Sequence, residues 1–418
     1  MDSNIELDRL RFQAGSIFTP RSPINERNLF AGRIEQIKRI MEAISQKGSH
    51  AVLYGERGVG KTSLSNVLAD FLSDLQQAPL ILRGNCDASD TYSSLWKKAL
   101  ADISIPHIKQ EIGFNGAEKI EQQSIISTLP EELSPNDIRI ILSRFRANTN
   151  VIIIFDEFDR LSDKLVATTL MADTIKLLSD SGVNATILLI GVADSVDKLI
   201  EHHHSIERAL IQIPMQRMSS EEIKEIILKG LNRLTMNISP EALEEIIDLS
   251  QGLPYITHLL SLGSVNATLD DKEKTISTSH IKTGIQNALE QWQQSIKSTY
   301  YAAVKSQQPD NIYKEVLLAC GLAKVDELGY FTAAAVRLPL NQIISGKNYG
   351  IPNFARHLKE FSEERRGCVL ERTGEKRRIR YRFRGPIMRP YLTIKGFSDG
   401  LLTKEKIKKI EQEFSQPS

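Results

Sequence analysis

The stretch Gly55-Glu-Arg-Gly-Val-Gly-Lys61-Thr62 lies between an apolar segment, residues 51–54, and a helical pattern that begins at Lys61. When a glycine-rich turn connects a strand to a helix in this order, the backbone N–H groups of the turn surround phosphates. We therefore predict that Lys61 contacts the β- and γ-phosphates of ATP and that the Thr62 hydroxyl coordinates Mg²⁺. The residues predicted to bind the nucleotide here are Gly55, Glu56, Arg57, Gly58, Val59, Gly60, Lys61, Thr62 and Ser63.

An acidic pair, Asp156-Glu157, ends the apolar run 151–155. In open α/β sheets the carboxyl ends of the strands form the ligand-binding edge, so the pair is predicted to face the phosphates. We expect Asp156 to hold Mg²⁺ through water and Glu157 to act as the general base that polarises the attacking water. Lys61 and Glu157 are therefore predicted to be catalytic.

Four strand-length apolar segments alternate with helical patterns, at 51–54, 79–82, 151–155 and 185–191. This alternation predicts an α/β domain with a parallel sheet that is buried on both faces. The stretch before residue 151 is expected to be long, polar and helical. Residues 1–30 show little periodicity, and we expect them to form an arm that lies on this first domain.

The strand patterns stop after Ser219, and capped helical patterns fill residues 219–300, with Ser219 and Ser239 as N-caps. A polar linker at 301–312 then precedes three short helices and a hairpin. Pro386 and Pro390 are expected to exclude a regular helix after the hairpin. The predicted domains are an arm (1–30), an α/β core (31–218), an all-helical domain (219–300), a domain of three helices and a hairpin (301–395) and a charged tail (396–418).

The net charge of +1 conceals a basic stretch at residues 365–395, with eleven lysines and arginines against two acids. A local positive excess of this size is typical of a surface that binds a polyanion. The three cysteines are widely spaced, which argues against a disulfide framework or a zinc site. Since no apolar run reaches the roughly 20 residues of a membrane span and the first residues are polar, we expect a cytoplasmic protein without a membrane contact.

Together, the two nucleotide motifs, the sequence Phe30-Ala-Gly-Arg33 and the helical region after Ser219 resemble the initiator clade of the AAA+ ATPases, which includes the origin-recognition and cell-division-control ATPases. The resemblance extends over about residues 28–300 and is strongest at the two motifs. It implies a P-loop AAA+ core with a helical lid and a C-terminal winged helix, and contacts to adenine near Phe30 and Arg33.

The sequence departs from that clade at two places. Asp194 stands at the end of the fourth strand, where the family usually has Asn, Ser or Thr, so hydrolysis is expected to be slow unless this carboxylate faces away from the phosphate. In the lid, residues 251–255 (QGLPY) resemble the GxP turn of signal-transduction ATPases, in which Pro254 packs against the nucleotide. An ordinary helix start is the other interpretation of this turn. His258 is a candidate phosphate sensor or a structural residue.

Arg208 follows the fourth strand where initiator ATPases carry an arginine finger. By resemblance it reaches the γ-phosphate of a neighbouring subunit, which implies a homo-oligomer. The alternative is a solvated helical arginine. The preceding residues 202–204 are three histidines, which point in different directions on a helix and are expected to be surface residues.

The C-terminal pattern of three helices, at 312–323, 331–338 and 351–363, and a hairpin at 368–383 resembles a winged helix. We expect the third helix to enter the major groove of duplex DNA and the wing to contact phosphates. The alternative is that the same arginines bind an acidic protein surface. The predicted DNA-binding residues are Arg356, Lys376, Arg377, Arg378 and Arg380.

Two functions remain open from the sequence. The first is an AAA+ ATPase that uses ATP and Mg²⁺ to assemble on DNA, in replication, transposition or genome defence. The second is a signalling ATPase that senses a trigger and controls a partner effector protein without binding DNA. DNA-stimulated turnover favours the first function, and turnover that changes only with a partner protein favours the second.

Overall fold

The computed structural model describes residues 2–20, 22–23, 30–56, 58–74, 77–110, 118–145, 149–161, 164–191, 206–291, 294–308, 310–326, 329–344, 346–374, 378–385 and 388–415. The chain forms two compact units. One, here called the α/β unit, comprises Arg33–Gly55 and Lys61–Met215. The other, here called the helical unit, comprises Met1–Gly32, Glu56–Gly60 and Gln216–Ser418.

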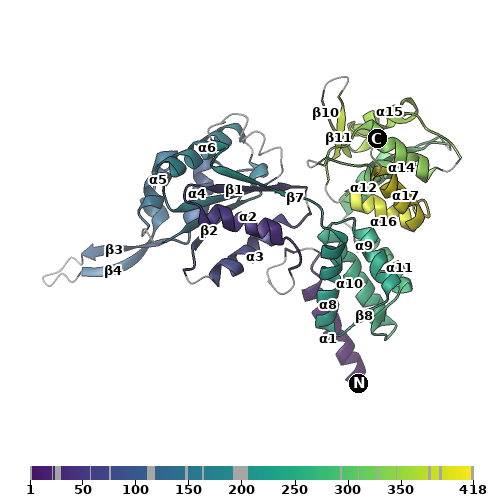
Figure 1. Ribbon diagram of the computed structural model, residues 1–418, viewed down its shortest axis with the longest axis horizontal. Helices are drawn as coiled ribbons and strands as arrows, with labels where there is room; N and C mark the ends of the chain where they lie inside the picture. Colours follow the sequence, from purple (N-terminus) through teal and green to yellow (C-terminus); the bar gives the residue numbers. More distant parts are fainter. Residues whose placement is uncertain are drawn as a thin grey trace. The chain divides into compact units, whose positions relative to one another are not determined.

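A parallel sheet forms the centre of the α/β unit (Figure 1). Its strands in spatial order are β2 (Leu80–Asn85), β5 (Val151–Asp156), β6 (Ala185–Gly191), β1 (His50–Gly55) and β7 (Leu210–Met215). The four predicted strands are confirmed. The fifth, β7, was not predicted, because Pro214 interrupts a short segment in which only part of the side chains are buried.

Helices cover both faces of this sheet, as parallel strands require (Figure 1). One face is covered by α4 (Tyr92–Leu100), α5 (Pro135–Ser143) and α6 (Lys164–Asp180), and the other by α2 (Ile34–Ser45) and α3 (Lys61–Ser73). Every residue of β5 is buried, and the Trp96 ring on α4 packs edge-to-face on Phe155 with 5.1 Å between centroids. The sheet therefore lies between two layers of helices, and the carboxyl ends of its strands form one edge of this arrangement.

An antiparallel hairpin stands where the sequence predicted a helical stretch, and that part of the prediction is wrong. The hairpin consists of β3 (Ser104–Gln110) and β4 (Glu118–Ser124), paired from Ser104↔Ser124 to Gln110↔Glu118, and the short helix η1 (Ile125–Thr128) follows it. The pairing between two polar segments holds the ribbon together, and periodicity within one segment does not reveal such pairing.

The predicted lid is helical. It contains α8 (Ser220–Leu234), α9 (Pro240–Ser250), α10 (Pro254–Asp270) and α11 (Thr278–Gln291), with the short strands β8 (Asn237–Ile238) and β9 (Thr275–Ile276) paired in parallel. Both predicted N-caps are confirmed, since the Ser219 hydroxyl accepts from the Glu222 N–H and the Ser239 hydroxyl accepts from the Ala242 N–H.

The N-terminal segment is a helix, α1 (Asp2–Ile17), which packs on the helices α8 and α10. The predicted arm on the first domain is therefore wrong. The anchor is Phe18, fully buried just after the helix, whose ring lies over Gly230 at a site where an added Cβ would come within 2.3 Å. Ala14 and Ile17 are buried beside it, so the apolar contacts are concentrated at the end of the helix.

The C-terminal part contains the three predicted helices and the hairpin. After α12 (Gln294–Val304), the elements are α13 (Tyr313–Leu322), α14 (Ala333–Ile343), α15 (Ile351–Glu360), the short helix η4 (Glu364–Arg366), β10 (Leu370–Thr373), β11 (Arg380–Phe383), α16 (Met388–Ser398) and α17 (Lys404–Ser415). An isolated bridge joins Phe331 to Tyr381, so the segment before α14 pairs with the hairpin.

The prediction that Pro386 and Pro390 exclude a helix is wrong, because α16 begins at Met388. Pro390 is the third residue of this helix, and the first turn needs no N–H donor within the helix. The final helix α17 packs on α14 and buries Ile407 and Ile410, so it is part of the packed structure. The predicted boundary at residues 395/396 falls inside α16.

Within the part of the chain that the structure describes, no helix has the length and apolar character to cross a membrane.

Candidate nucleotide-binding site

The glycine-rich loop lies where its sequence predicts, between the end of β1 and the start of α3. Gly58 and Gly60 have φ angles of 87° and 95°, a region that side chains with a Cβ rarely adopt. Within the α/β unit, Lys61 Nζ donates to the Gly55 carbonyl oxygen at 2.9 Å. The lysine is thus folded back onto the end of the strand, at the first turn of the helix whose N-terminus attracts anions.

The two predicted metal ligands lie together. The Thr62 side chain lies close enough to the Asp156 carboxylate to lower its pKa, and the Glu157 N–H donates to Asp156 Oδ1 at 2.8 Å. Burial raises the pKa of Asp156 above its usual value, and Thr62, the bond from Glu157 and the charge of Lys61 oppose that rise. Asp156 is 8% exposed, so a cation at this carboxylate would lower its pKa again.

Glu157 is the first residue after β5 and adopts a left-handed backbone conformation, with φ 54° and ψ 36°. Its Oε2 accepts from Arg160 Nη1 at 2.6 Å, across the short helix η2 (Phe158–Arg160). A non-glycine residue in this region of backbone space is uncommon and is frequent at functional sites. Arg160 was not predicted, although its position three residues after Glu157 is a visible signal for an ion pair.

Thr62 and Asp156 offer the donor set that Mg²⁺ prefers, which is one or two hard oxygens with the remaining positions left to water and substrate phosphate. Lys61 adds a cation next to them. The buried Asp156 carboxylate has a raised pKa and therefore gains from a nearby cation. These residues fit a nucleotide with bound Mg²⁺. Ser63, the following residue of α3, is half-buried.

Glu56, the second residue of the loop, has a partner that sequence reasoning missed. Arg217 donates Nε and Nη2 to the two Glu56 oxygens at 2.9 and 3.0 Å, and both residues belong to the helical unit. In the same unit, Pro254 Cγ lies 3.9 Å from the Cβ position of Gly60. Val59 is fully buried. No local pattern identifies Arg217, because it is separated from Glu56 by 161 positions.

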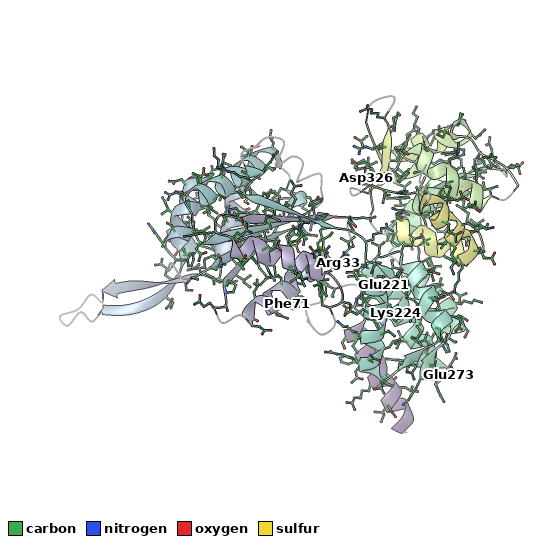
Figure 2. The ribbon with its side chains drawn as sticks, viewed as in Figure 1. Arg33, Phe71, Glu221, Lys224, Glu273 and Asp326 are labelled. Carbon is green, nitrogen blue, oxygen red and sulfur yellow. The ribbon has the colours of Figure 1, made fainter. Side chains whose placement is uncertain are left out.

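The two residues with predicted adenine contacts belong to different units. Phe30 is buried in the helical unit, and its carbonyl oxygen accepts from Lys229 Nζ at 2.9 Å. Arg33 is buried in the α/β unit at the start of α2, with φ 63° (Figure 2). Their contacts to adenine stay a prediction. Arg57 and Asp194 lie outside the described residues, as do the histidines at 202–204.

His258 does not have the character of a phosphate sensor. Burial lowers its pKa to about 4, so the ring is neutral near pH 7, and it packs edge-to-face on Phe18 at 6.0 Å. Arg208, in contrast, is 83% exposed, and its Nη2 lies 3.5 Å from Asp180 Oδ1. Arg208 is therefore accessible on the α/β unit, and its role in a neighbouring subunit stays a prediction.

The basic residues of the C-terminal part have many acidic and carbonyl partners. Arg356 Nε binds Glu360 at 2.7 Å, and Arg380 Nη1 binds Asp326, labelled in Figure 2, at 3.2 Å. Arg389 is buried and donates to carbonyl oxygens of the Gly321–Ala323 segment. Arg378 is exposed, whereas Lys376 and Arg377 lie outside the described residues. The positive excess at residues 365–395 is therefore partly neutralised by acids from other segments.

Comparisons with known proteins agree with this geometry. Residues 29–185 match the family model of the AAA ATPase domain. A Walker-type ATPase of Pyrococcus abyssi is 14% identical with a TM-score of 0.51, over 90% of this chain and 99% of that chain. Identity at this level shows a common fold. No curated protein matches the chain.

Two further solved structures match with TM-scores below 0.5. The ORC2 protein of Aeropyrum pernix, in ADPNP and ADP complexes, is 13% identical with a TM-score of 0.47, over 95% of this chain and 97% of that chain. A Cdc6 protein of Pyrobaculum aerophilum is 13% identical with a TM-score of 0.46, over 96% of this chain and 99% of that chain. The chain thus carries an AAA ATPase domain with a parallel-sheet α/β core.

Proposed function

We propose that the chain is an ATP-binding and ATP-hydrolysing AAA+ switch that requires Mg²⁺. The observation that carries this proposal is the proximity of the Thr62 side chain, from the glycine-rich motif, to the buried Asp156 carboxylate, from the acidic motif. It brings the two predicted metal ligands together beside Lys61, at the edge of the sheet where parallel folds bind ligands.

Each residue has a distinct task in this proposal. Lys61 neutralises charge on the β- and γ-phosphates, and Thr62 and Asp156 hold the metal directly and through water. Bound Mg²⁺ supplies charge stabilisation to the phosphates. Glu157 accepts the proton of the attacking water. Its Oε2 accepts from Arg160 Nη1 at 2.6 Å, and the second carboxylate oxygen has no part in that bond.

A titration with a fluorescent ATP analogue, with Mg²⁺ and with excess EDTA, tests this function. We expect micromolar or tighter binding in Mg²⁺, weaker binding in EDTA, and phosphate release that depends on Mg²⁺. A chain that is folded by circular dichroism but binds the analogue equally in Mg²⁺ and EDTA, with no phosphate release, contradicts the proposal.

We further propose that the C-terminal part contacts duplex DNA. The order helix, bridge, helix, helix and hairpin, from α13 to β11, is similar to that of a winged helix. Asn353, Arg356 and Lys359 are exposed on α15, the third of these helices. The bond of Arg356 to Glu360 uses one of its five N–H donors, so the guanidinium keeps donors for a base edge or a phosphate.

The signalling function is the second candidate, and one observation favours it. Acidic partners from outside the basic stretch bind Arg365, Arg380 and Lys395, which reduces the charge available to a polyanion. An electrophoretic mobility assay with duplex DNA, with and without ATP, separates the two candidates. A shift at 0.15 M salt favours the DNA function. Absence of a shift, together with turnover that responds to a partner protein, favours signalling.

The third part of the proposal is that subunits assemble and Arg208 reaches a neighbouring site. Its 83% exposure and its long pair with Asp180 leave the guanidinium accessible for such a contact. If so, Arg208→Ala loses turnover and keeps nucleotide affinity, and mixing it with Lys61→Ala subunits restores sites where an intact Arg208 meets an intact loop. A loss that is proportional to the variant fraction, with no restoration, contradicts the role in a neighbouring subunit.

A further inference from the structure

Arg217 precedes α8 by three residues and connects two segments of the helical unit. Its Nε and Nη2 bind the two carboxylate oxygens of Glu56 at 2.9 and 3.0 Å. Its Nη1 donates to the Gln251 carbonyl oxygen at 3.2 Å. Both charged side chains are 23% exposed, so water screens the pair only in part. A bidentate arginine–carboxylate pair has a defined orientation, which fixes Glu56 relative to the turn at Gln251.

The turn that Arg217 holds is itself tightly joined to the segment around Arg217. The Met218 N–H donates to the Gly252 carbonyl oxygen at 2.8 Å. Gly252 has φ 72°, and a Cβ there would lie 2.6 Å from the Met218 carbonyl oxygen and 2.8 Å from Arg217 Cβ. Only glycine permits this approach. Residues 217–218 and the turn at 251–252 therefore behave as one piece.

The loop segment 56–60 is contacted at both of its ends, at one by Arg217 and at the other by Pro254, which follows the turn at 251–252. Arg217 binds Glu56 at the first position of the loop segment 56–60, and Pro254 lies 3.9 Å from the Cβ position of Gly60 at the last. The two glycines of this segment allow many conformations when the loop is not held. Contacts at both ends restrict the loop and direct its N–H groups for phosphate binding.

Glu56 also has an electrostatic role, because a carboxylate in a phosphate-binding loop repels the ligand unless a cation neutralises it. The guanidinium of Arg389, on α16, is buried, and its pKa depends on the charges of both Arg217 and Glu56. Burial and the charge of Arg217 lower the pKa of Arg389 to about 9, against the charge of Glu56, which raises it. Arg389 Nη1 is buried and has no hydrogen-bond partner among the described residues.

We propose that Arg217 is a positioning residue for nucleotide binding. It neutralises Glu56 and ties the phosphate-binding loop to the lid turn at 251–254, so that affinity for nucleotide depends on the lid. This inference rests on the proposed ATP-binding function. The coupling free energy between nucleotide binding and the lid turn is reciprocal. Nucleotide binding at the loop therefore stabilises the lid turn.

The test compares affinities of the full-length chain for fluorescent ATP and ADP analogues in Mg²⁺. Arg217→Gln is expected to weaken ATP binding at least tenfold and ADP binding less, because the uncompensated Glu56 charge repels the more highly charged ligand more strongly. The double variant Glu56→Gln/Arg217→Gln removes the repulsion but leaves the loop untied, so it is expected to regain only part of the lost affinity and to remove the difference between ATP and ADP. Lys224→Gln, which removes an exposed charge from α8 of the same lid, is the matched control (Figure 2).

Each outcome has one meaning. Arg217→Gln affinities within twofold of the Lys224→Gln control overturn the inference, as does an equal loss of ATP and ADP that the double variant does not restore. Should Arg217→Gln fail to fold, Arg217→Lys keeps the charge with a single donor group, and we expect a loss of about threefold that is again larger for ATP. If wild type and Lys61→Ala bind the analogue equally, the proposed ATP-binding function fails instead.

Discussion

The nucleotide edge of the α/β unit and the basic C-terminal part were both identified from sequence, and they differ in how charges are arranged. At the edge, Lys61, Thr62 and Asp156 lie together as the motifs require. In the C-terminal part, many predicted cations bind acids or carbonyls of their own fold, as Arg356 binds Glu360. A motif specifies residue types at fixed spacing, whereas a local excess of charge ignores acids that the fold brings from elsewhere. A charge count along a segment is therefore weaker evidence for a ligand than a motif.

The largest effect is expected at the edge. In the proposed function Lys61 neutralises the β- and γ-phosphates, so Lys61→Ala is expected to abolish detectable binding of a fluorescent ATP analogue. Lys176→Ala, which removes an exposed lysine from α6 of the same unit, is the control and is expected to bind normally. Normal binding by Lys61→Ala would mean that the phosphates bind elsewhere. The motif at the edge would then be no better a guide to a ligand than the charge excess in the C-terminal part.

Glu157→Gln separates binding from chemistry at the same edge. The amide cannot accept a proton from water, so turnover is expected to fall by about 10²- to 10⁴-fold while ATP affinity changes little. Arg160→Ala is the companion variant, because it frees the Glu157 carboxylate from its partner and is not expected to reduce turnover. Phosphate release under single-turnover conditions measures both. Unchanged turnover in Glu157→Gln moves the general base to another residue.

The sequence predictions succeeded where a local pattern determines the structure and failed where contacts between distant segments do. The strands 51–54, 151–155 and 185–191 were predicted because buried parallel strands are apolar throughout. The Arg217–Glu56 pair was not, since it joins residues 161 positions apart and neither residue belongs to a pattern. The hairpin β3–β4 was missed for a related reason, as its pairing is between two polar segments. Local periodicity predicts elements, and contacts between distant segments need the fold.

The C-terminal part shows a further limit of sequence reasoning. Arg389 was counted as part of a basic surface, but it is buried and bonded to the Gly321–Ala323 segment. Pro390, next to it, was expected to prevent a helix that in fact begins two residues earlier. In both cases a residue type was assigned its most common role, and its position within α16 decided otherwise.

Glu360 provides the next prediction, on stability. Its carboxylate is 3% exposed and binds Tyr313, Arg356 and Arg365. Glu360→Gln leaves these arginines without a buried counter-charge and is expected to destabilise the C-terminal part by about 2–4 kcal/mol. Glu363→Gln, at an exposed pair with Arg365, is the control and is expected to cost less than about 1 kcal/mol. Hydrogen exchange of the α13 and α15 amides measures the difference. Equal protection in the two variants contradicts the structural role of Glu360.

The same residue predicts a pH dependence. Burial alone raises the pKa of Glu360, but the bonds from Tyr313 and Arg356 and the charge of Arg365 bring it to about 2. Because this folded-state pKa is below the usual value of 4.5, the unfolded chain binds more protons between these limits. The contribution is present above about pH 4.5 and is lost as the pH falls towards 2. In Glu360→Gln the acid-induced loss of α15 protection is expected to be smaller.

The smallest expected effect concerns the wing and tests whether its remaining charges bind DNA at all. Neutralising Lys376, Arg377 and Arg378 changes three positive charges in the sequence between β10 and β11, and the packing of this hairpin depends on Tyr381 and Phe383. Folding is expected to survive, since exposed charges contribute little to stability. If these residues contact phosphates, the slope of log K against log [salt] for duplex DNA shrinks by about 0.9 per lost contact.

The matched control neutralises Lys224, Lys408 and Lys409, three exposed lysines on other helices, and so changes the net charge equally. A smaller slope in the wing variant than in this control assigns phosphate contacts to the wing. Sequence preference is expected to stay the same in both, because bases are read by the third helix in the proposed arrangement. Equal slopes in the two triple variants contradict a DNA-binding wing. The basic stretch would then resemble the rest of its fold, with arginines that bind protein carboxylates, and the signalling function would be favoured.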